Sequence, residues 1–317
     1  MSAHLLEVRG LTKVYRVRGR REPLRAVDGV SLYVDAGETL GLVGESGCGK
    51  STLGRAILRL DAPTAGEVYF DGKRVDADSI HALRRGMQMV FQNPFTALDP
   101  RMTIGGSIAE GLEIHRIGKN RAARRARVAE LMEMAGLDAG LASRYPHELS
   151  GGQRQRAGIA RALAVEPRFL ICDEPVSALD VSAQAQILNT LLDLQERLGL
   201  ACLFIAHDLA AVRQVSHRIA VMYLGRIVES GPADDIVHAP RHPYTRALLD
   251  AAPVADPQAA KARARRAPEG EAAFAPEGFA GCPFCPRCRF ATEQCARERP
   301  TLCGAEGGRL VACHHPL

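Results

Sequence analysis

Hydrophobic and polar residues follow two different periods along the first 250 residues of the chain. Apolar and polar positions alternate in residues 5–9 and 24–35, which is typical of half-buried strands. Residues 169–172 form a continuous apolar run, which is typical of a strand buried on both faces in the middle of a parallel sheet. Apolar runs predict further strands at residues 38–43, 66–72, 87–91, 201–206, 218–224 and 226–229.

Helical periodicity separates these strands. A helix is predicted over residues 52–58, and residues 99–165 form a helical insertion that includes a helix at 121–135. The next helix, at 181–197, is amphipathic and carries Ile187, Leu191, Leu194 and Leu198 on one side. Because strands alternate with helices, we expect an α/β fold with a doubly wound sheet, in which ligands bind where the strands end.

The composition changes after residue 251. Residues 252–277 are rich in Ala, Pro, Arg and Glu and lack hydrophobic periodicity, so we interpret them as a linker. Residues 278–317 are rich in cysteine and are too short to build a core without a cross-link or a metal. The sequence therefore predicts one large domain at residues 1–251 and a small C-terminal segment.

Composition and charge describe an ordinary globular protein, with 46% hydrophobic and 24% charged residues. Much of the net charge of +5 comes from basic clusters at residues 116–127 and 261–266. The first cluster lies in an alanine-rich predicted helix, which favours a solvated helix face over a nucleic-acid site. No apolar run reaches the roughly 18 residues that a membrane span needs, and the N-terminus lacks the pattern of a secretory signal. We expect a cytosolic protein whose membrane role comes through partners.

Residues 44–52 match the phosphate-binding pattern G-x-x-x-x-G-K-[ST] at every position. The glycines let backbone N–H groups surround phosphate oxygens, and the N-terminus of the following helix adds partial positive charge. Lys50 is expected to reach the β- and γ-phosphates, and Ser51 to bind Mg²⁺. The loop alone fits ATP or GTP, and its predicted binding residues are Gly44, Ser46, Gly47, Cys48, Gly49, Lys50, Ser51 and Thr52.

The cysteines are unevenly distributed, since six of the nine fall between Cys282 and Cys313. In a reducing cytosol such a cluster favours binding of a metal or an iron–sulfur cluster over disulfides.

A second motif identifies the family. Residues 149–153 read Leu-Ser-Gly-Gly-Gln, and Arg-Gln-Arg-Ala follows. With the phosphate-binding loop before it and Asp173-Glu174 after it, this run resembles the nucleotide-binding subunits of ABC transporters over residues 5–250. The resemblance implies an ABC-type P-loop NTPase fold with a helical subdomain at about 99–165, and it favours ATP over GTP.

The resemblance also assigns roles to single residues. Asp173 resembles the Walker B carboxylate that holds Mg²⁺ through water, and Glu174 the catalytic base that polarises the attacking water. Gln92 is similar to the glutamine that senses the γ-phosphate, contributes to the Mg²⁺ site and faces the membrane partner. His207 is similar to the histidine that contacts the γ-phosphate, and Tyr15 to the aromatic residue that stacks on adenine.

For the Leu-Ser-Gly-Gly-Gln motif, the resemblance implies a dimer. In the family its serine, glycines and helix N-terminus close over the ATP of a second subunit. The residues with this implied role are Ser150, Gly151, Gly152 and Gln153, and Asp180 belongs to the loop that crosses the dimer interface. Two ATP molecules would then lie between two subunits.

Three stretches resemble the dipeptide and oligopeptide importer branch of the family: residues 41–48, 91–100 and 242–249. Membership implies a second, non-identical ATPase subunit, two transmembrane permeases and an extracytoplasmic peptide-binding protein. It also implies a peripheral position on the cytoplasmic face of the inner membrane. Nickel and glutathione importers share much of the pattern and stay open as alternatives.

The C-terminal segment resembles the cysteine region of peptide importers. That resemblance implies Cys282, Cys288, Cys295 and Cys313 as ligands of a [4Fe–4S] cluster, with Zn²⁺ as the alternative. Cys285 stands where a histidine is expected, and Cys303 is an additional cysteine, so either could replace one of the four.

Three other functions fit the sequence less well. A soluble ABC ATPase acting on nucleic acid would need cysteines inserted in the ATPase core and two ATPase units per chain. This chain has neither, so we expect no nucleic-acid partner. A non-hydrolysing regulatory module is disfavoured by the presence of Glu174 and His207. An ABC exporter is disfavoured by the peptide-importer stretches and by the cysteine-rich C-terminal segment.

Overall fold

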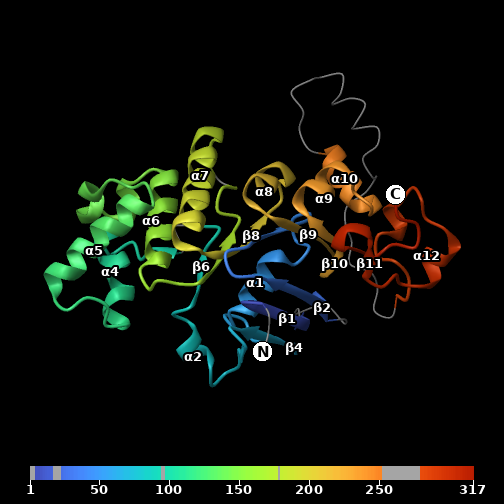
Figure 1. The fold of residues 1–317 in the computed structure, drawn as a ribbon, viewed down its shortest axis with the longest axis horizontal. Coiled ribbons are helices and arrows are strands. Elements are labelled where there is room, and N and C mark those ends of the chain that lie inside the picture. The colour runs from blue at the N-terminus through green and yellow to red at the C-terminus, as the bar shows by residue number, and fades with distance from the viewer. Residues whose placement is uncertain (1–3, 17–22, 94–96, 178, 252–278) are drawn as a thin grey trace. The chain divides into compact units, whose positions relative to one another are not determined.

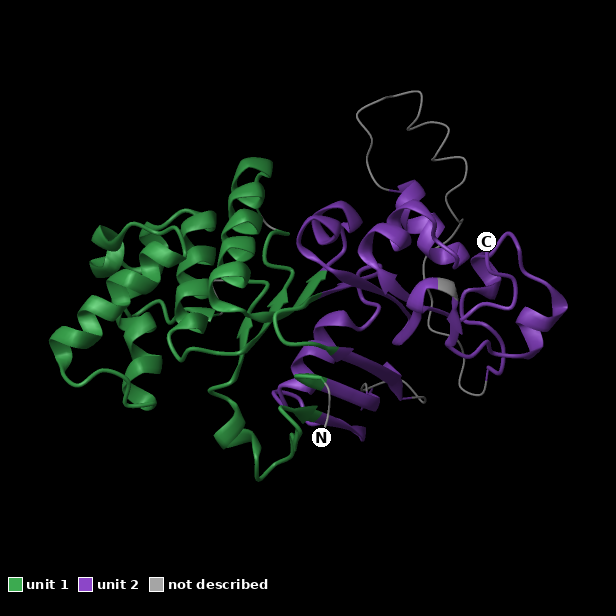
Figure 2. Cartoon of the chain, in the orientation of Figure 1, with its two compact units in different colours: residues 1–6, 34–39, 69–205 green, residues 7–33, 40–68, 206–317 purple. Residues whose placement is uncertain are grey.

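A computed structural model gives the fold of the chain (Figure 1) and describes residues 4–16, 23–93, 97–177, 179–251 and 279–317. The predicted linker at 252–277 lies outside these described residues. The chain divides into two compact units (Figure 2). Unit 1 comprises residues 1–6, 34–39 and 69–205, and unit 2 comprises residues 7–33, 40–68 and 206–317.

Parallel strands form the centre of unit 1. They are β6 (Met87–Val90), β7 (Phe169–Asp173) and β8 (Ala201–Ala206). Strand β7 pairs in parallel with β6 on one side and with β8 on the other. All five residues of β7 are buried, which confirms the prediction of a central strand that is covered on both faces.

Helices make up most of the rest of unit 1 (Figure 2). Helices α4, α5 and α6 contact one another and lie within residues 99–165, where the helical insertion was predicted. Helix α4 is capped by Thr103 and α5 by Asn120, whose side chains accept hydrogen bonds from backbone N–H groups of the first turn. The helices of unit 1 are α2 (Ile80–Leu83), α4 (Ile104–Ile114), α5 (Arg121–Met134), α6 (Gly151–Leu163), α7 (Val181–Leu198) and the 3₁₀ helices η1 (Ala139–Ser143) and η2 (Pro146–Glu148).

Helix α7 buries most of its predicted apolar side. Ile187 and Leu194 are buried and Leu191 is half-buried, whereas Leu198 is 46% exposed. Leu198 is exposed at the last position of the helix, where Gly199 follows in the left-handed conformation.

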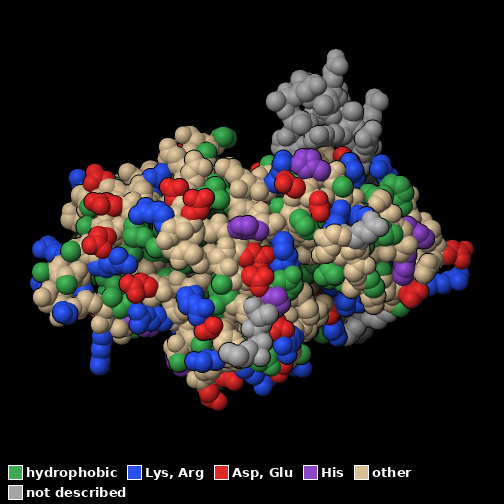
Figure 3. Space-filling view, in the orientation of Figure 1, with side chains coloured by type: hydrophobic (Ala, Val, Ile, Leu, Met, Phe, Trp, Pro, Cys, Tyr) green, Lys and Arg blue, Asp and Glu red, His purple; other side chains and the backbone are tan. Residues whose placement is uncertain are grey.

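The basic residues of α5 lie on the surface, as predicted for a solvated helix face. Arg121 and Arg125 are exposed, whereas Val128, Leu131 and Met132 are buried. The space-filling view shows Lys and Arg side chains over this helical part of unit 1 (Figure 3).

A β-hairpin confirms a predicted turn. Strand β4 (Ala65–Phe70) pairs antiparallel with the two-residue strand β5 (Lys73–Arg74). Between them Asp71 and Gly72 both have positive φ angles, 51° and 73°, as a type I′ turn requires.

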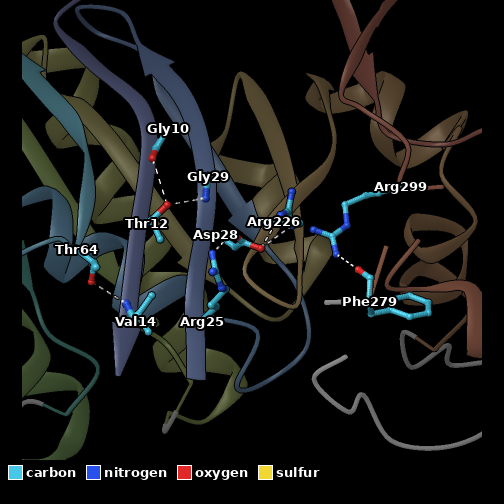
Figure 4. Close-up of polar contacts among 10 residues, drawn as sticks. All are labelled: Gly10, Thr12, Val14, Arg25, Asp28, Gly29, Thr64, Arg226, Phe279 and Arg299. Carbon is cyan, nitrogen blue, oxygen red and sulfur yellow. Dashed lines mark hydrogen bonds and ion pairs between the residues drawn. The ribbon is translucent and has the colours of Figure 1, made fainter. Parts of the chain in front are cut away.

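Unit 2 contains β1 (Leu6–Tyr15) and β2 (Leu24–Val34), and β1 lies between β2 and β4. Thr12 on β1 accepts a hydrogen bond from Gly29 N–H and donates one to the carbonyl of Gly10 (Figure 4). Thr64, just before β4, accepts one from Val14 N–H at 3.0 Å.

A second group of strands in unit 2 is mixed. Strand β3 (Thr39–Val43) pairs in parallel with β9 (Arg218–Tyr223), and β10 (Arg226–Pro232) pairs antiparallel with β9. The C-terminal segment continues the group with β12 (Arg309–Val311) and β11 (Cys303–Ala305), both antiparallel. The fold is therefore α/β, as predicted, but a purely doubly wound sheet was not the right description.

The helices of unit 2 are α1 (Lys50–Ile57), α8 (Leu209–Val215), α9 (Ala233–His238), α10 (Pro243–Ala251), α12 (Glu293–Arg297) and the 3₁₀ helices η3 (Cys285–Arg287) and η4 (Glu306–Gly308). Within the described part of the chain, none of the helices has the length and apolar character to cross a membrane.

A buried ion pair and strand pairing attach the C-terminal segment to the rest of unit 2. Arg309 Nη2 donates to Glu229 Oε1 at 2.8 Å, and Glu229 is fully buried. Beside this pair, Ala312 N–H donates to the carbonyl of Val228 at 2.8 Å. Within the segment, Arg299 donates to the carbonyl of Phe279 (Figure 4).

Candidate nucleotide-binding site

The phosphate-binding loop in unit 2 has space only for glycine at two of its positions. A Cβ at Gly44 would lie 2.2 Å from the carbonyl oxygen of Met222, and one at Gly49 would lie 2.0 Å from the carbonyl oxygen of Ala26. Gly47 has open space around it but a φ of 79°, which a larger residue adopts with strain. The three glycines therefore keep the loop backbone in a tight curve, which is the shape that surrounds phosphate oxygens.

Lys50 lies inside this curve. It opens helix α1 and is only 4% exposed. Its Nζ donates to the carbonyl oxygens of Gly44 at 2.7 Å and of Glu45 at 3.1 Å. The ammonium group is thus held in the loop by carbonyl groups, which an incoming phosphate oxygen can replace as its partner.

Tyr15 ends strand β1, and its ring is fixed by charged neighbours. Its hydroxyl donates to Asp61 Oδ2 at 3.3 Å, and Lys13 Nζ lies 4.9 Å from the ring centre. Burial, together with the Asp61 carboxylate, raises the pKa of Tyr15, so the phenol is neutral at physiological pH. Its role in stacking on adenine stays a prediction.

The predicted acidic pair lies at the end of β7 in unit 1. Asp173 is the last residue of the strand and is 5% exposed, whereas Glu174 is half-buried and begins the following turn. Glu174 has a φ of 44°, in the left-handed region that non-glycine residues rarely adopt. Its N–H donates to the carbonyl of Ile205 on β8 at 2.9 Å, which fixes the turn. Strain of this kind is common at functional positions.

The structure brings Gln92 and Glu174 together, although 82 residues separate them. Gln92 Nε2 donates to Glu174 Oε2 at 2.7 Å. This contact follows from the pairing of their strands, because β6 and β7 run in parallel and end at the same edge. The hydrogen bond uses the amide nitrogen of Gln92, so its carbonyl oxygen is the atom that can bind a cation or a water.

The Leu-Ser-Gly-Gly-Gln motif starts helix α6 in unit 1. Ser150 is the N-cap: its Oγ accepts from Gln153 N–H at 3.3 Å, and Gln153 Oε1 accepts from Ser150 N–H at 2.9 Å. This reciprocal pair is a capping box and fixes the start of the helix. A Cβ at Gly151 would lie 3.3 Å from Leu179, and one at Gly152 would lie 3.5 Å from Ala183.

A cavity of about 500 Å³ opens in front of this helix start, a size typical of small-ligand sites. Asp180 lines it and caps α7, since its Oδ1 accepts from Ala183 N–H at 2.9 Å. Arg156 also lines it and is held by Gln186 and by the carbonyl of Gly136. Residues of the motif and of the segments 136–141 and 179–186 complete the lining.

His207 lies just after β8 and is exposed. Asp208 follows it and caps helix α8, accepting from Ala210 N–H at 2.8 Å. The cap fixes the backbone at the point where the histidine side chain emerges. The predicted contact of His207 with a γ-phosphate stays a prediction.

Sequence reasoning missed a contact that holds the phosphate-binding loop from the C-terminal segment. The carboxylate of Glu45 accepts two hydrogen bonds from Arg287, both at 2.9 Å. Glu45 N–H donates to the hydroxyl of Tyr244 at 2.9 Å. The only signal available was that Glu45 and Arg287 each stand inside a motif, and neither motif predicts the other.

Five of the six C-terminal cysteines line one small cavity, together with imidazole rings. The five are Cys282, Cys285, Cys288, Cys295 and Cys313, while Cys303 is exposed on β11 and is not part of the lining. Burial raises the pKa of Cys282 to about 11, and it also raises the pKa of Cys285, Cys288 and Cys313. In the described residues, no group of three or more His, Cys, Asp or Glu side chains is arranged to hold a metal ion.

Comparison with known proteins supports the same assignment. Residues 27–177 match the family model of the ABC transporter, and residues 228–295 match the C-terminal region of oligopeptide/dipeptide transporters. A probable peptide ABC transporter ATP-binding protein of Sinorhizobium fredii is 50% identical over 99% of this chain and 90% of its own length. A putative oligopeptide transport ATP-binding protein of Bacillus subtilis is 49% identical over 98% of this chain and 95% of its own length.

Solved structures agree in fold. A dimeric bacterial ABC transporter cassette is 33% identical, with a TM-score of 0.66 over 72% of this chain and 98% of that chain. The same values hold for a dimeric cassette in a post-hydrolysis state bound to ADP and Pi. The chain therefore belongs to the ATP-binding subunits of peptide and oligopeptide ABC transporters, ATPases that couple hydrolysis to transport.

Proposed function

We propose that this chain energises the import of di- and oligopeptides across the cytoplasmic membrane, through ATP-driven closure of an ATPase dimer. The observation that carries the proposal is the 2.7 Å hydrogen bond between Gln92 and Glu174. It joins the glutamine that would face the permease to the carboxylate that would activate water. A change at the permease contact can therefore reach the group that controls hydrolysis.

Glu174 is the proposed general base. Its carboxylate is half-buried at a strand end and is oriented by Gln92, so it can accept a proton from a water that attacks the γ-phosphate. Lys50 and the backbone N–H groups of the glycine loop would bind the phosphates, and His207 would contact the γ-phosphate. Tyr15 would stack on the adenine ring.

The donor set suits Mg²⁺, which prefers hydroxyl, amide and carboxylate oxygens. Ser51 Oγ, the Asp173 carboxylate and the Gln92 carbonyl oxygen would hold the ion. When bound with ATP, Mg²⁺ neutralises charge on the β- and γ-phosphates. The burial of Asp173 fits this role, because a buried carboxylate is costly without a cation.

The motif at 150–153 would bind the ATP of a second subunit. The cavity of about 500 Å³ at the start of α6 combines a serine hydroxyl, helix N–H groups and Arg156, which suit an anionic ligand. Asp180, which caps the neighbouring helix, would lie at the subunit interface. The second subunit is proposed to be a non-identical ATPase of the same family.

The remaining proposed partners are two transmembrane permeases and an extracytoplasmic peptide-binding protein, with this chain on the cytoplasmic face of the membrane. The similar proteins carry names of peptide and oligopeptide transport, which favours peptides over nickel or glutathione as the cargo.

The cysteine cavity is proposed to hold a [4Fe–4S] cluster, with Zn²⁺ as the alternative. Cys282, Cys288, Cys295 and Cys313 would be the ligands, and Cys285 lines the same cavity as a substitute. Thiolates are suitable ligands for either group, but the described side chains are not arranged around an ion, so the cysteines would have to move to bind one. The exposed Cys303 is no longer a good candidate. Anaerobic purification, the visible spectrum and assays of iron, sulfide and zinc decide between them, and a folded, active protein without either metal would refute this part.

The transport proposal is tested by reconstitution. The chain is combined with a second ATPase, the permeases and the binding protein of one operon in proteoliposomes, and uptake of labelled di- and oligopeptides, nickel and glutathione is measured. We expect ATP-dependent uptake of peptide that stops with Glu174→Gln, and ATPase activity that rises when the permeases are present. Uptake of nickel or glutathione without peptide would overturn the cargo assignment.

A further inference from the structure

Glu45 of the phosphate-binding loop makes hydrogen bonds to three residues of unit 2. The carbonyl of Glu45 accepts from Lys50 at 3.1 Å, and its N–H donates to Tyr244 on α10 at 2.9 Å. Its side chain is held by two hydrogen bonds from Arg287, at the end of η3. Lys50 belongs to the loop itself, so the outside attachments are Tyr244 and Arg287.

Arg287 is firmly seated in the C-terminal segment. Its side chain is 11% exposed, and it lies between Cys285 and Cys288 in the chain. Phe284, three residues before it, is buried and has its ring 5.4 Å from Tyr244 and 5.3 Å from Tyr223. Phe284 also lines the cysteine cavity. The rings of Tyr223, Tyr244 and Phe284 thus connect the phosphate-binding loop and Arg287 with that cavity.

Because Glu45 is negatively charged, its pair with Arg287 affects the affinity of the loop for ATP. A carboxylate in a loop that binds a triphosphate repels the ligand unless it is neutralised. Arg287 neutralises it with a bidentate pair, the strongest type of side-chain ion pair, and holds both carboxylate oxygens toward the C-terminal segment.

We propose that Arg287 is a positioning residue for ATP: by pairing with Glu45, the cysteine-rich segment sets the shape and charge of the phosphate-binding loop. ATP affinity then depends on the seating of this segment, whatever metal its cysteines bind. By linkage, bound ATP stabilises the seating of the segment in return. The inference rests on the ATPase activity of the family and not on the proposed peptide cargo or cluster.

The test uses the full-length chain and measures binding of a fluorescent ATP analogue together with the KM and kcat of ATPase activity. Arg287→Ala is expected to weaken nucleotide binding and raise KM about 5- to 20-fold while kcat changes less than about twofold. This range reflects a charged hydrogen-bonded pair, discounted for partial exposure of Glu45. Arg287→Lys should recover part of the loss, because it keeps the charge and loses the bidentate geometry.

The matched control is Arg289→Ala, two residues further along, whose guanidinium lies 4.8 Å from the ring centre of Phe290. It removes the same charge from the same segment and should leave KM within about twofold, since surface charges contribute little. Metal content and circular dichroism of each variant show whether the segment is intact.

The decisive comparison is made on a Glu45→Gln background. There Arg287→Ala should change KM by less than about twofold, because the charge that it neutralises is gone. An equal effect with and without the Glu45 carboxylate would overturn the proposal, as would an unchanged KM in Arg287→Ala. Hydrogen exchange of residues 282–288 adds an independent measure: ATP should slow it in the wild type and not in Arg287→Ala.

Discussion

The ion pair between Glu229 and Arg309 offers the sharpest test of how the C-terminal segment is attached. Glu229 is fully buried on β10, and its two oxygens accept from Arg241 N–H at 2.8 Å, His242 N–H at 2.9 Å and Arg309 at 2.8 Å. Arg309 is 7% exposed at its side chain and also donates to the carbonyl of Ala239 at 2.6 Å. The substitution Arg309→Met keeps the apolar volume and removes the charge.

The expected loss of stability follows from the buried Glu229 carboxylate that Arg309→Met leaves without its partner. Breaking a buried ion pair by removing one partner costs about 3–5 kcal/mol, because the remaining charge is left uncompensated. Two backbone N–H groups still donate to Glu229 in the variant, so we expect the lower end, about 3 kcal/mol. At 1.36 kcal/mol for each factor of ten, this corresponds to a roughly 150-fold larger equilibrium constant for opening of this part of the chain.

Native-state hydrogen exchange measures this locally, without assuming that two units unfold together. The reporter is Ala312 N–H, which donates to Val228 beside the β10–β12 pairing. Its protection should fall roughly 150-fold in Arg309→Met. Arg297→Met is the control, because its pair with Glu293 is 78% and 85% exposed at the two side chains and should contribute almost nothing.

The result is interpreted against Glu229→Gln. In that background Arg309→Met should reduce the protection of Ala312 N–H much less, because no buried carboxylate remains to be neutralised. Equal losses in the two backgrounds, or equal losses from the Arg309 and Arg297 substitutions, would show that the buried charge does not hold the segment in place.

Three further predictions follow from the site and its surroundings. Glu174→Gln should bind ATP normally but lose about 10²–10⁴-fold in ATP turnover, as expected for a general base; single-turnover assays with a filter-binding measurement separate the two, and retained turnover would refute the role. Gly49→Ala should lose nucleotide binding, because its Cβ would meet a backbone carbonyl at 2.0 Å, whereas Gly158→Ala has open space and should bind as the wild type does in the same fluorescence titration. His242 has its pKa lowered by burial from 6.5 to about 4, so the neutral form is favoured in the folded state. The contribution of His242 to the free energy of unfolding should therefore be complete above pH 6.5 and decrease by about 3 kcal/mol as the pH drops toward 4. Urea titrations at several pH values measure this decrease, which should be absent in His242→Gln. A wild-type stability that does not change with pH over this range would contradict the prediction.

The parts of the fold that local patterns could predict are those whose physical cause is local. Strand β7 is a run of five buried residues, so its apolar sequence alone indicated a central position. The Asp71-Gly72 turn was visible because few other residue pairs adopt two positive φ angles. Helix α7 was found by its period, and its predicted end at residue 197 lies one residue before the observed end at Leu198.

What the sequence could not show depends on contacts between distant segments. Strand β12 is three residues long, which is too short for a pattern of alternating apolar and polar residues. It forms because it can pair with the edge of β10. The Glu45–Arg287 pair joins residues 242 positions apart. Within the site, the resemblance named Gln92 and Glu174 separately, and only the parallel pairing of β6 with β7 explains why they touch.

The attachment of the C-terminal segment also changes the argument for a metal. Its length suggested that it needed a cross-link or a metal to be stable, on the assumption that it builds its own core. Instead, Phe284 packs against Tyr223 and Tyr244 of unit 2, and β12 extends an existing group of strands. The segment packs against the core of the rest of unit 2, so a metal is not needed to explain its stability. The proposal of a cluster rests on a narrower observation, the convergence of five thiols on one cavity, and its failure would leave both the fold and the contact with the phosphate-binding loop intact.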